Sequence, residues 1–91
     1  MPQLFKMDGY RIYFWSNEGQ PLEPIHVHVS KNQRKNSTKI WITENGKCVV
    51  ENNNSKISDT TLKNITEMIE LHADEIIEEW KNRFKTISFY C

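Results

Sequence analysis

Two of the three histidines of this chain, His26 and His28, stand two residues apart in a run of alternating apolar residues. Side chains at positions i and i+2 of a β-strand point to the same face, so a strand here would place the two imidazoles side by side. Adjacent imidazoles suit metal binding, acid–base catalysis or recognition of an anion. The run therefore marks one face of a predicted strand as the first place to look for function.

As metal ligands, the two histidines would supply two of the three or four protein donors that a zinc site needs. The chain offers these candidates for a further donor: Asp8, Glu18, Glu23, Cys48 and His72. No second pair of closely spaced ligands accompanies the histidines, so the usual four-ligand pattern is missing. We therefore expect no cofactor, and a divalent metal held by His26 and His28 is the alternative.

As catalytic groups, His26 and His28 would act as a general base and a general acid, which suffices for cleavage of a phosphodiester without a metal. Arg11 or Lys39 would stabilise the developing negative charge. A histidine-based or metal-assisted nuclease is therefore one hypothesis. The opposing interpretation is structural, with both imidazoles hydrogen-bonded inside the fold, and we favour a binding protein over an enzyme.

Strand signals fill the first half of the chain. Segments rich in β-branched and aromatic residues predict strands at 4–7, 10–15, 25–30, 38–43 and 48–51. Asp8-Gly9 and Asn45-Gly46 are tight-turn signals between neighbouring segments. Short connections of this kind indicate an antiparallel meander of four to five strands.

A helical pattern fills the second half. Over residues 60–84, apolar side chains recur three or four positions apart, which is typical of an amphipathic helix, and Ser58 or Asp59 is placed to cap it. The stripe consists of Leu62, Ile65, Ile69, Ala73, Ile76, Trp80 and Phe84. Its constant phase favours one long helix, whereas the usual length of helices favours a bend near His72. We expect one α+β domain over 1–91, with strands within about 4–51 and a helical region of about 59–85 packed on one face.

The strand pattern also predicts two unlike faces of the sheet. The aliphatic face is the natural seat of the C-terminal helix, because an antiparallel sheet commonly covers one face and leaves the other to water. The second face, here called the aromatic–histidine face, gathers Arg11, Tyr13, Trp15, His26, His28, Lys39 and Trp41. Exposed aromatic residues form hot spots for partner proteins and stacking platforms for RNA. We expect this face to bind a protein partner or RNA, or to form a homodimer.

Charge is balanced overall but segregated along the chain. The formal net charge is zero, so the whole molecule has no electrostatic attraction to nucleic acid or membrane. Residues 1–50 carry seven Lys and Arg against four Asp and Glu, and residues 51–91 carry five against eight. The basic stretch from Lys31 to Lys39 either contacts phosphates or keeps a hairpin loop soluble.

The lack of targeting segments and the placement of the two cysteines together predict where in the cell the protein resides. No apolar stretch is long enough to span a membrane, and the first residues do not form a signal peptide. Cys48 and Cys91 are placed as free thiols of a reducing compartment rather than as a structural bridge. We therefore expect a cytoplasmic protein with no membrane partner.

Several of these residues resemble a known family. The features that carry the resemblance are Met1-Pro2, Gly9 ahead of Ile12-Tyr13-Phe14, Asn17-Glu18, the P-x-H-x-H run from Pro24, and Trp80 in the C-terminal helix. They are similar to DUF4160, a small bacterial family of unknown function, over nearly the whole chain. The family usually has Pro-Pro-His-x-His, whereas Ile25 replaces the second proline here, and Glu18 stands where Asp is common.

The resemblance adds weight to Pro24, His26 and His28 as functional positions. It also implies a short, stand-alone protein. Members of the family often lie beside members of a second small family of unknown function. That arrangement suggests a regulatory pair of toxin–antitoxin-like kind.

Overall fold

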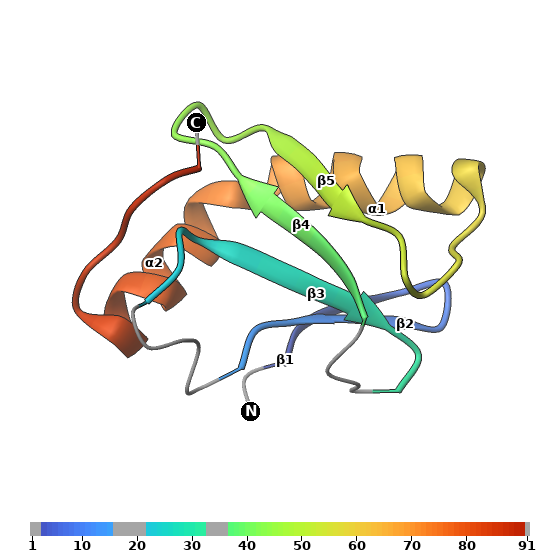
Figure 1. Ribbon diagram of the computed structural model, residues 1–91, viewed down its shortest axis with the longest axis horizontal. Helices are drawn as coiled ribbons and strands as arrows, with labels where there is room; N and C mark the ends of the chain where they lie inside the picture. The colour runs from blue at the N-terminus through green and yellow to red at the C-terminus, as the bar shows by residue number, and fades with distance from the viewer. Residues whose placement is uncertain (1–2, 16–21, 33–36, 91) are drawn as a thin grey trace.

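The chain forms a five-stranded antiparallel sheet with two helices on one face (Figure 1). The computed structural model describes residues 3–15, 22–32 and 37–90. The elements are β1 (Gln3–Met7), β2 (Tyr10–Tyr13), β3 (His26–Ser30), β4 (Thr38–Ile42), β5 (Cys48–Asn52), α1 (Asp59–Leu71) and α2 (Ala73–Phe84). Strand order in the sheet follows the order along the chain. The predicted α+β meander with C-terminal helices is therefore confirmed.

The two predicted tight turns are present. Asp8 and Gly9 both have positive φ angles, 52° and 83°, as a two-residue type I′ hairpin requires. Gly46 has a φ of 78°, and its N–H donates to the carbonyl of Thr43 at 2.9 Å. Both glycines are thus placed where the backbone needs the left-handed region.

The helical region is two helices rather than one. Ser58 caps α1 by accepting a hydrogen bond from the N–H of Thr61 at 3.3 Å. The helical path breaks at His72, whose φ and ψ are −106° and 17°. A single straight helix that joined the 13 residues of α1, the junction residue His72 and the 12 residues of α2 would be roughly 39 Å long. Because the longest dimension of the Cα trace is 33 Å, the bend keeps the apolar stripe on the sheet.

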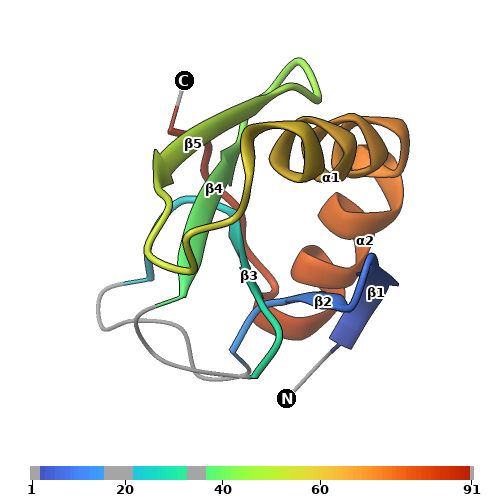
Figure 2. The same ribbon diagram turned by 90° about the vertical axis from the view of Figure 1, so that its right-hand side faces the viewer.

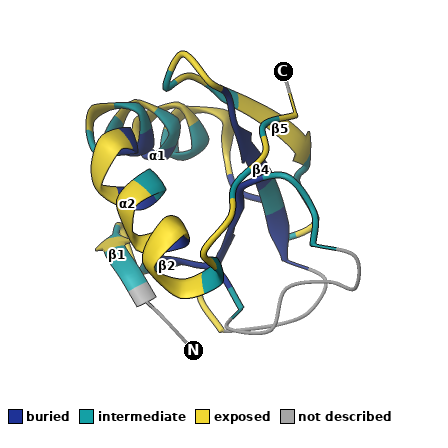
Figure 3. Cartoon of the chain, turned by 90° about the vertical axis from the view of Figure 1, so that its left-hand side faces the viewer, coloured by how far each residue is buried: buried dark blue, intermediate teal, exposed yellow. Residues whose placement is uncertain are grey.

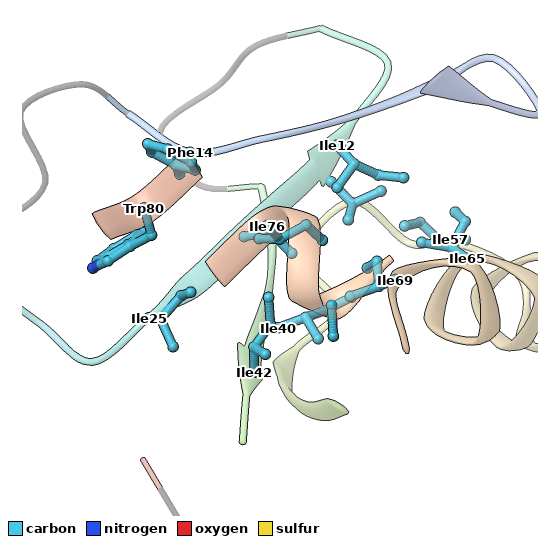
Figure 4. Packing of buried hydrophobic residues seen from close by; sticks show 13 residues of the cluster. Ile12, Phe14, Ile25, Ile40, Ile42, Ile57, Ile65, Ile69, Ile76 and Trp80 are labelled. Carbon is cyan, nitrogen blue, oxygen red and sulfur yellow. The ribbon is translucent and has the colours of Figure 1, made fainter. Parts of the chain in front are cut away.

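The core lies between the helix pair and the predicted aliphatic face of the sheet (Figures 2 and 3). The strands contribute Ile12, Phe14, Ile25, Val27, Val29, Ile40 and Ile42. The helices contribute Ile65, Ile69, Ala73, Ile76 and Trp80, and Figure 4 shows most of these side chains meeting. Strand alternation and helical phase therefore identified both surfaces of the core.

A polar loop ties the sheet to the start of α1. The Thr38 hydroxyl donates to the Asn53 side-chain oxygen at 2.8 Å, and the Ser55 hydroxyl donates to the carbonyl of Val29 at 2.7 Å. Asn53 also holds Ile57 through two hydrogen bonds with its backbone. These bonds position the residue before the α1 cap, so the helix begins where the sheet can receive it.

The packing predicts a contrast between two aliphatic residues of the helical region. Ile76→Ala should lower the free energy of unfolding by about 2–5 kcal/mol, because it opens a cavity in the core. Leu71→Ala, at a position 80% exposed, should change it by less than about 0.5 kcal/mol. Urea denaturation followed by circular dichroism measures both, and equal midpoints would contradict this account of the core.

Candidate functional site

The structure brings the central residues of the aromatic–histidine face into one cluster. The imidazoles of His26 and His28 lie 5.0 Å apart between ring centroids, with their planes nearly perpendicular. Trp41 is the cross-strand partner of His26, with ring centroids 5.5 Å apart. Tyr13 is the partner of His28 at 5.7 Å, and Trp15 lies 5.5 Å from Tyr13. The i and i+2 spacing therefore does place both imidazoles side by side.

The expectation that water covers this face is wrong for most of it. Tyr13 and His26 are fully buried, and Trp41 and His28 retain only 6% and 7% exposure. An antiparallel sheet leaves one face wet only when no other part of the chain packs on it. Here both faces of the central strands are covered, so most of these side chains lie inside the fold.

The C-terminal segment supplies part of the cover. Residues 85–90 run back from the end of α2 toward β4 (Figure 1). The N–H of Ile25 donates to the carbonyl of Ser88 at 2.9 Å. The Tyr90 ring stacks on Trp41 with 4.9 Å between centroids and 5° between planes. The segment therefore shields the end of the sheet where His26 lies.

Sequence reasoning did not assign a role to this segment, although a signal is present. Ile87 and Phe89 pack against the hydrophobic core, whereas Ser88 and Tyr90 alternate with them and make the contacts at Ile25 and Trp41. This is a period of two, the pattern of an extended chain. The alternation of apolar and other residues at the end of the chain therefore predicts an extended segment there.

The imidazole of His26 contacts both its neighbours on the aromatic–histidine face and the helix layer. Its Nδ1 lies 2.9 Å from the carbonyl oxygen of Pro24. A carbonyl oxygen only accepts, so Nδ1 carries the proton, and in the neutral ring Nε2 bears the lone pair. The ring also lies 5.5 Å from the indole of Trp80 on α2. These contacts support the structural interpretation of this imidazole.

A hydroxyl network holds the other end of the cluster. The Tyr13 hydroxyl lies 3.0 Å from the Oγ atoms of both Ser30 and Ser37. Ser30 in turn donates to the carbonyl of Asn32. All three hydroxyl-bearing residues are buried, so the network satisfies polar groups that burial would otherwise penalise.

The rim of the cluster carries charges of both signs. The Lys39 ammonium lies 4.3 Å above the Trp41 ring and 2.7 Å from a carboxylate oxygen of Glu23. The Trp41 indole N–H donates to a carboxylate oxygen of Glu51 at 3.1 Å. Lys39 is thus both a cation–π partner and half of an ion pair. Its charge is locally balanced, and this edge is not a basic patch.

The remaining predicted binding residues lie around this cluster. Arg11 is half-buried and pairs with Ser30, two residues along β2 from Tyr13. Trp15 is half-buried beside Tyr13. In the predicted basic loop, Lys31 lies over the ring of Tyr10 at 5.4 Å, whereas Arg34 and Lys35 fall outside the described residues.

The suggested metal donors are dispersed. Asp8 lies in the first hairpin turn, and His72 pairs with Glu75 at the helix junction. Glu23 is engaged by Lys39, and Glu18 lies outside the described residues. Within ranges 3–15, 22–32 and 37–90, no three His, Cys, Asp or Glu side chains are grouped to hold a metal ion. The expectation that no cofactor is needed stays a prediction.

Cys48, the other suggested donor, has an unreactive thiol. Burial, together with the smaller effect of the nearby carboxylate of Glu70, raises the pKa of Cys48 from 9.0 to about 12. The thiol lies 3.7 Å from the carbonyl of Thr66, which accepts from it. Because the thiolate is the nucleophile and the metal ligand, a neutral thiol here serves packing.

The fold and the site together define a small α+β protein: a helix-backed meander with a largely buried aromatic–histidine face. A family model described as a domain of unknown function, DUF4160, matches residues 9–81. The chain belongs to this family, as the resemblance predicted. No curated protein and no solved structure matches the chain. None of the helices in the described part is long and apolar enough to cross a membrane.

The hydroxyl network predicts a stability difference between two tyrosines. Tyr13→Phe removes a buried hydroxyl that contacts two serines, and should lower the free energy of unfolding by about 1–2 kcal/mol. Tyr90→Phe keeps the stacked ring and is the matched control, with an expected change below about 0.5 kcal/mol. Chemical denaturation of both variants tests this, and an unchanged Tyr13→Phe midpoint would show that the network contributes nothing.

The thiol predicts slow alkylation and a loss of stability at high pH. In a Cys91→Ser background, iodoacetamide at pH 8 should label Cys48 slowly in the folded chain and fully in guanidinium, as followed by mass spectrometry. The same pKa difference predicts how stability depends on pH. The unfolded thiol ionises near pH 9 and the folded thiol near pH 12, so the thiol of the unfolded state loses its proton first. The contribution of Cys48 is therefore complete below pH 9 and declines as the pH rises toward 12. Rapid labelling of the folded chain at pH 8 would contradict the raised pKa.

Proposed function

We propose that this chain is a small binding module, one member of a regulatory pair of toxin–antitoxin-like kind, that engages a partner protein through the exposed rim of the aromatic–histidine face. The proposed setting is the bacterial cytoplasm, which rests on the family resemblance and on the free thiol of Cys48. The pairing likewise rests on the resemblance. The binding surface rests on geometry.

One observation carries the proposal: an ordered stack that ends in an exposed aromatic ring. Lys39 lies over Trp41, and Trp41 stacks on Tyr90. Tyr90 keeps 55% of its surface exposed, while its contact with the nearly buried Trp41 holds the ring in place. An aromatic ring that is exposed to solvent and also fixed by a stacking contact loses little conformational freedom on binding. Such a ring is favoured as a contact residue in an interface.

The charges at this rim favour a protein over RNA. Single-stranded RNA is bound by cations that follow its backbone together with aromatic platforms. Lys39 is paired with Glu23, and the carboxylate of Glu51 holds the Trp41 indole. Negative groups beside the aromatic ring would repel phosphates. A protein surface, in contrast, can offer both charge signs and an apolar contact.

Burial of the histidines supports binding over catalysis. A general acid or base must come within hydrogen-bond reach of its substrate. His26 is fully buried and its Nδ1 donates to Pro24, while His28 retains 7% exposure. The nuclease alternative therefore requires the covering chain to move away before cleavage.

The rim proposal is tested with a photo-crosslinking residue at Tyr90 in the full chain, expressed in cells of its source. We expect one covalent adduct with a protein, because the ring at 90 is exposed and held in place. Lys63, exposed on the outer side of α1, is the matched control position and should give no such adduct. An RNase-sensitive adduct, an adduct of two copies of this chain, or none at all would overturn the proposal.

The nuclease alternative has its own test. The purified chain should leave RNA and DNA substrates intact at about pH 6.5, near the ordinary pKa of histidine, with and without added divalent metal. Cleavage that disappears in His26→Gln and His28→Gln, while both variants stay folded, would replace the binding proposal with the catalytic one.

A further inference from the structure

A groove separate from the rim lies between β1 and α2. It encloses about 710 Å³, and β1 and α2 run beside each other in two views (Figures 2 and 3). Its accessible floor is apolar, formed by the half-buried side chains of Leu4 and Phe5 over the core residue Ile76. The other described residues that line it are all acidic: Asp74, Glu75, Glu78 and Glu79. The groove is therefore an apolar surface bordered by negative charge.

A second hollow follows the same strand toward the first hairpin. It encloses about 420 Å³ and is lined by Met7, Asp8, Asn64, Glu67, Met68 and Leu71. His72 stands at the helix junction between α1 and α2, with its ring 4.8 Å from Phe5 and its Nδ1 3.2 Å from Glu75. Among the described residues that line the two hollows, none is Lys or Arg. Every Asp, Glu, Lys or Arg in the described lining of the two hollows is therefore acidic.

The strand beside these hollows is the edge of the sheet. β1 pairs with β2 on one side, and no further strand of the described sheet lies on its other side. An open edge offers backbone donors and acceptors to an extended segment, and neighbouring pockets select its side chains. The edge, the apolar floor and the acidic border all point to a ligand that is extended, apolar in part and basic.

We propose that this groove binds an extended basic segment of a partner protein. Apolar side chains of the segment would cover Leu4 and Phe5, and its Lys or Arg side chains would pair with Glu78 and Glu79. Charge complementarity selects this occupant, because an acidic segment would bring like charges together and a purely apolar one would leave the carboxylates unpaired. The inference does not depend on the rim at Tyr90, which involves β4, so either surface can fail alone.

The test uses a displayed library of random twelve-residue peptides, selected against the full chain. We expect enriched peptides to combine Lys or Arg with Leu, Ile or Phe. One such peptide, synthesised and titrated into isotope-labelled protein, should shift backbone resonances of β1 and α2 rather than those around Trp41 and Tyr90. Its affinity should fall as salt rises, because exposed ion pairs are screened.

Charge reversal gives the sharpest comparison. Glu78→Lys should weaken the selected peptide by roughly fivefold, since one exposed attraction is replaced by a repulsion. Glu44→Lys makes the same change of charge in the turn between β4 and β5 and is the matched control, with unchanged affinity expected. Both carboxylates are exposed, so both variants should fold.

Four results would overturn the proposal. They are no enrichment, enrichment of acidic or uncharged peptides, equal weakening by the two reversals, and resonance shifts confined to the Trp41 and Tyr90 rim. A dimer in sedimentation, with backbone resonances of β1 and α2 that shift on dilution, would replace the proposed partner by a second copy of this chain. Loss of the Tyr90 crosslink with groove binding intact would instead reject the rim proposal alone.

Discussion

The packing of the aliphatic face of the sheet on the helix pair is the interaction on which the rest of the structure depends. Alternating residues of β2, β3 and β4 meet the stripe of α1 and α2 with almost no exposed surface. A straight helix would overrun the 33 Å molecule, so the chain bends at His72 and α2 follows the sheet. The place where α2 ends is therefore set by this contact.

The end of α2 determines what happens to the opposite face. Lys85 adopts a left-handed conformation with a φ of 65°, and its N–H donates to the carbonyl of Lys81. This C-cap turns the chain, and residues 85–90 return along the sheet to Ile25 and Trp41. The stacking of Tyr90 on Trp41 is thus a consequence of where the helix pair ends on the other face.

Two surfaces of different electrostatic character remain outside the core. The rim at Tyr90 has Lys39, Glu23 and Glu51 within one set of contacts, so attraction there depends on shape and aromatic packing. The charged residues that border the groove beside β1, within the described part of the chain, are all carboxylates. The segregation of charge along the sequence therefore becomes a segregation in space, because the acidic second half forms the helix layer. A protein with zero net charge can in this way carry a surface region that is strongly negative.

The sequence by itself determined the strands, their turns, the two faces of the sheet and the phase of the helix stripe. It did so because periods of two and of three to four are local properties of the chain, and because Asp8-Gly9 and Gly46 occupy backbone conformations that few other residues accept. It also placed the imidazoles of His26 and His28 together, since a strand leaves no other arrangement. Only the tertiary structure decided that there are two helices, that the aromatic–histidine face is largely buried, and that carboxylates of α2 border an edge strand. These features depend on contacts between residues far apart in the chain, such as Trp41 with Tyr90 and Phe5 with His72, and no local pattern specifies which distant surface will cover a given face.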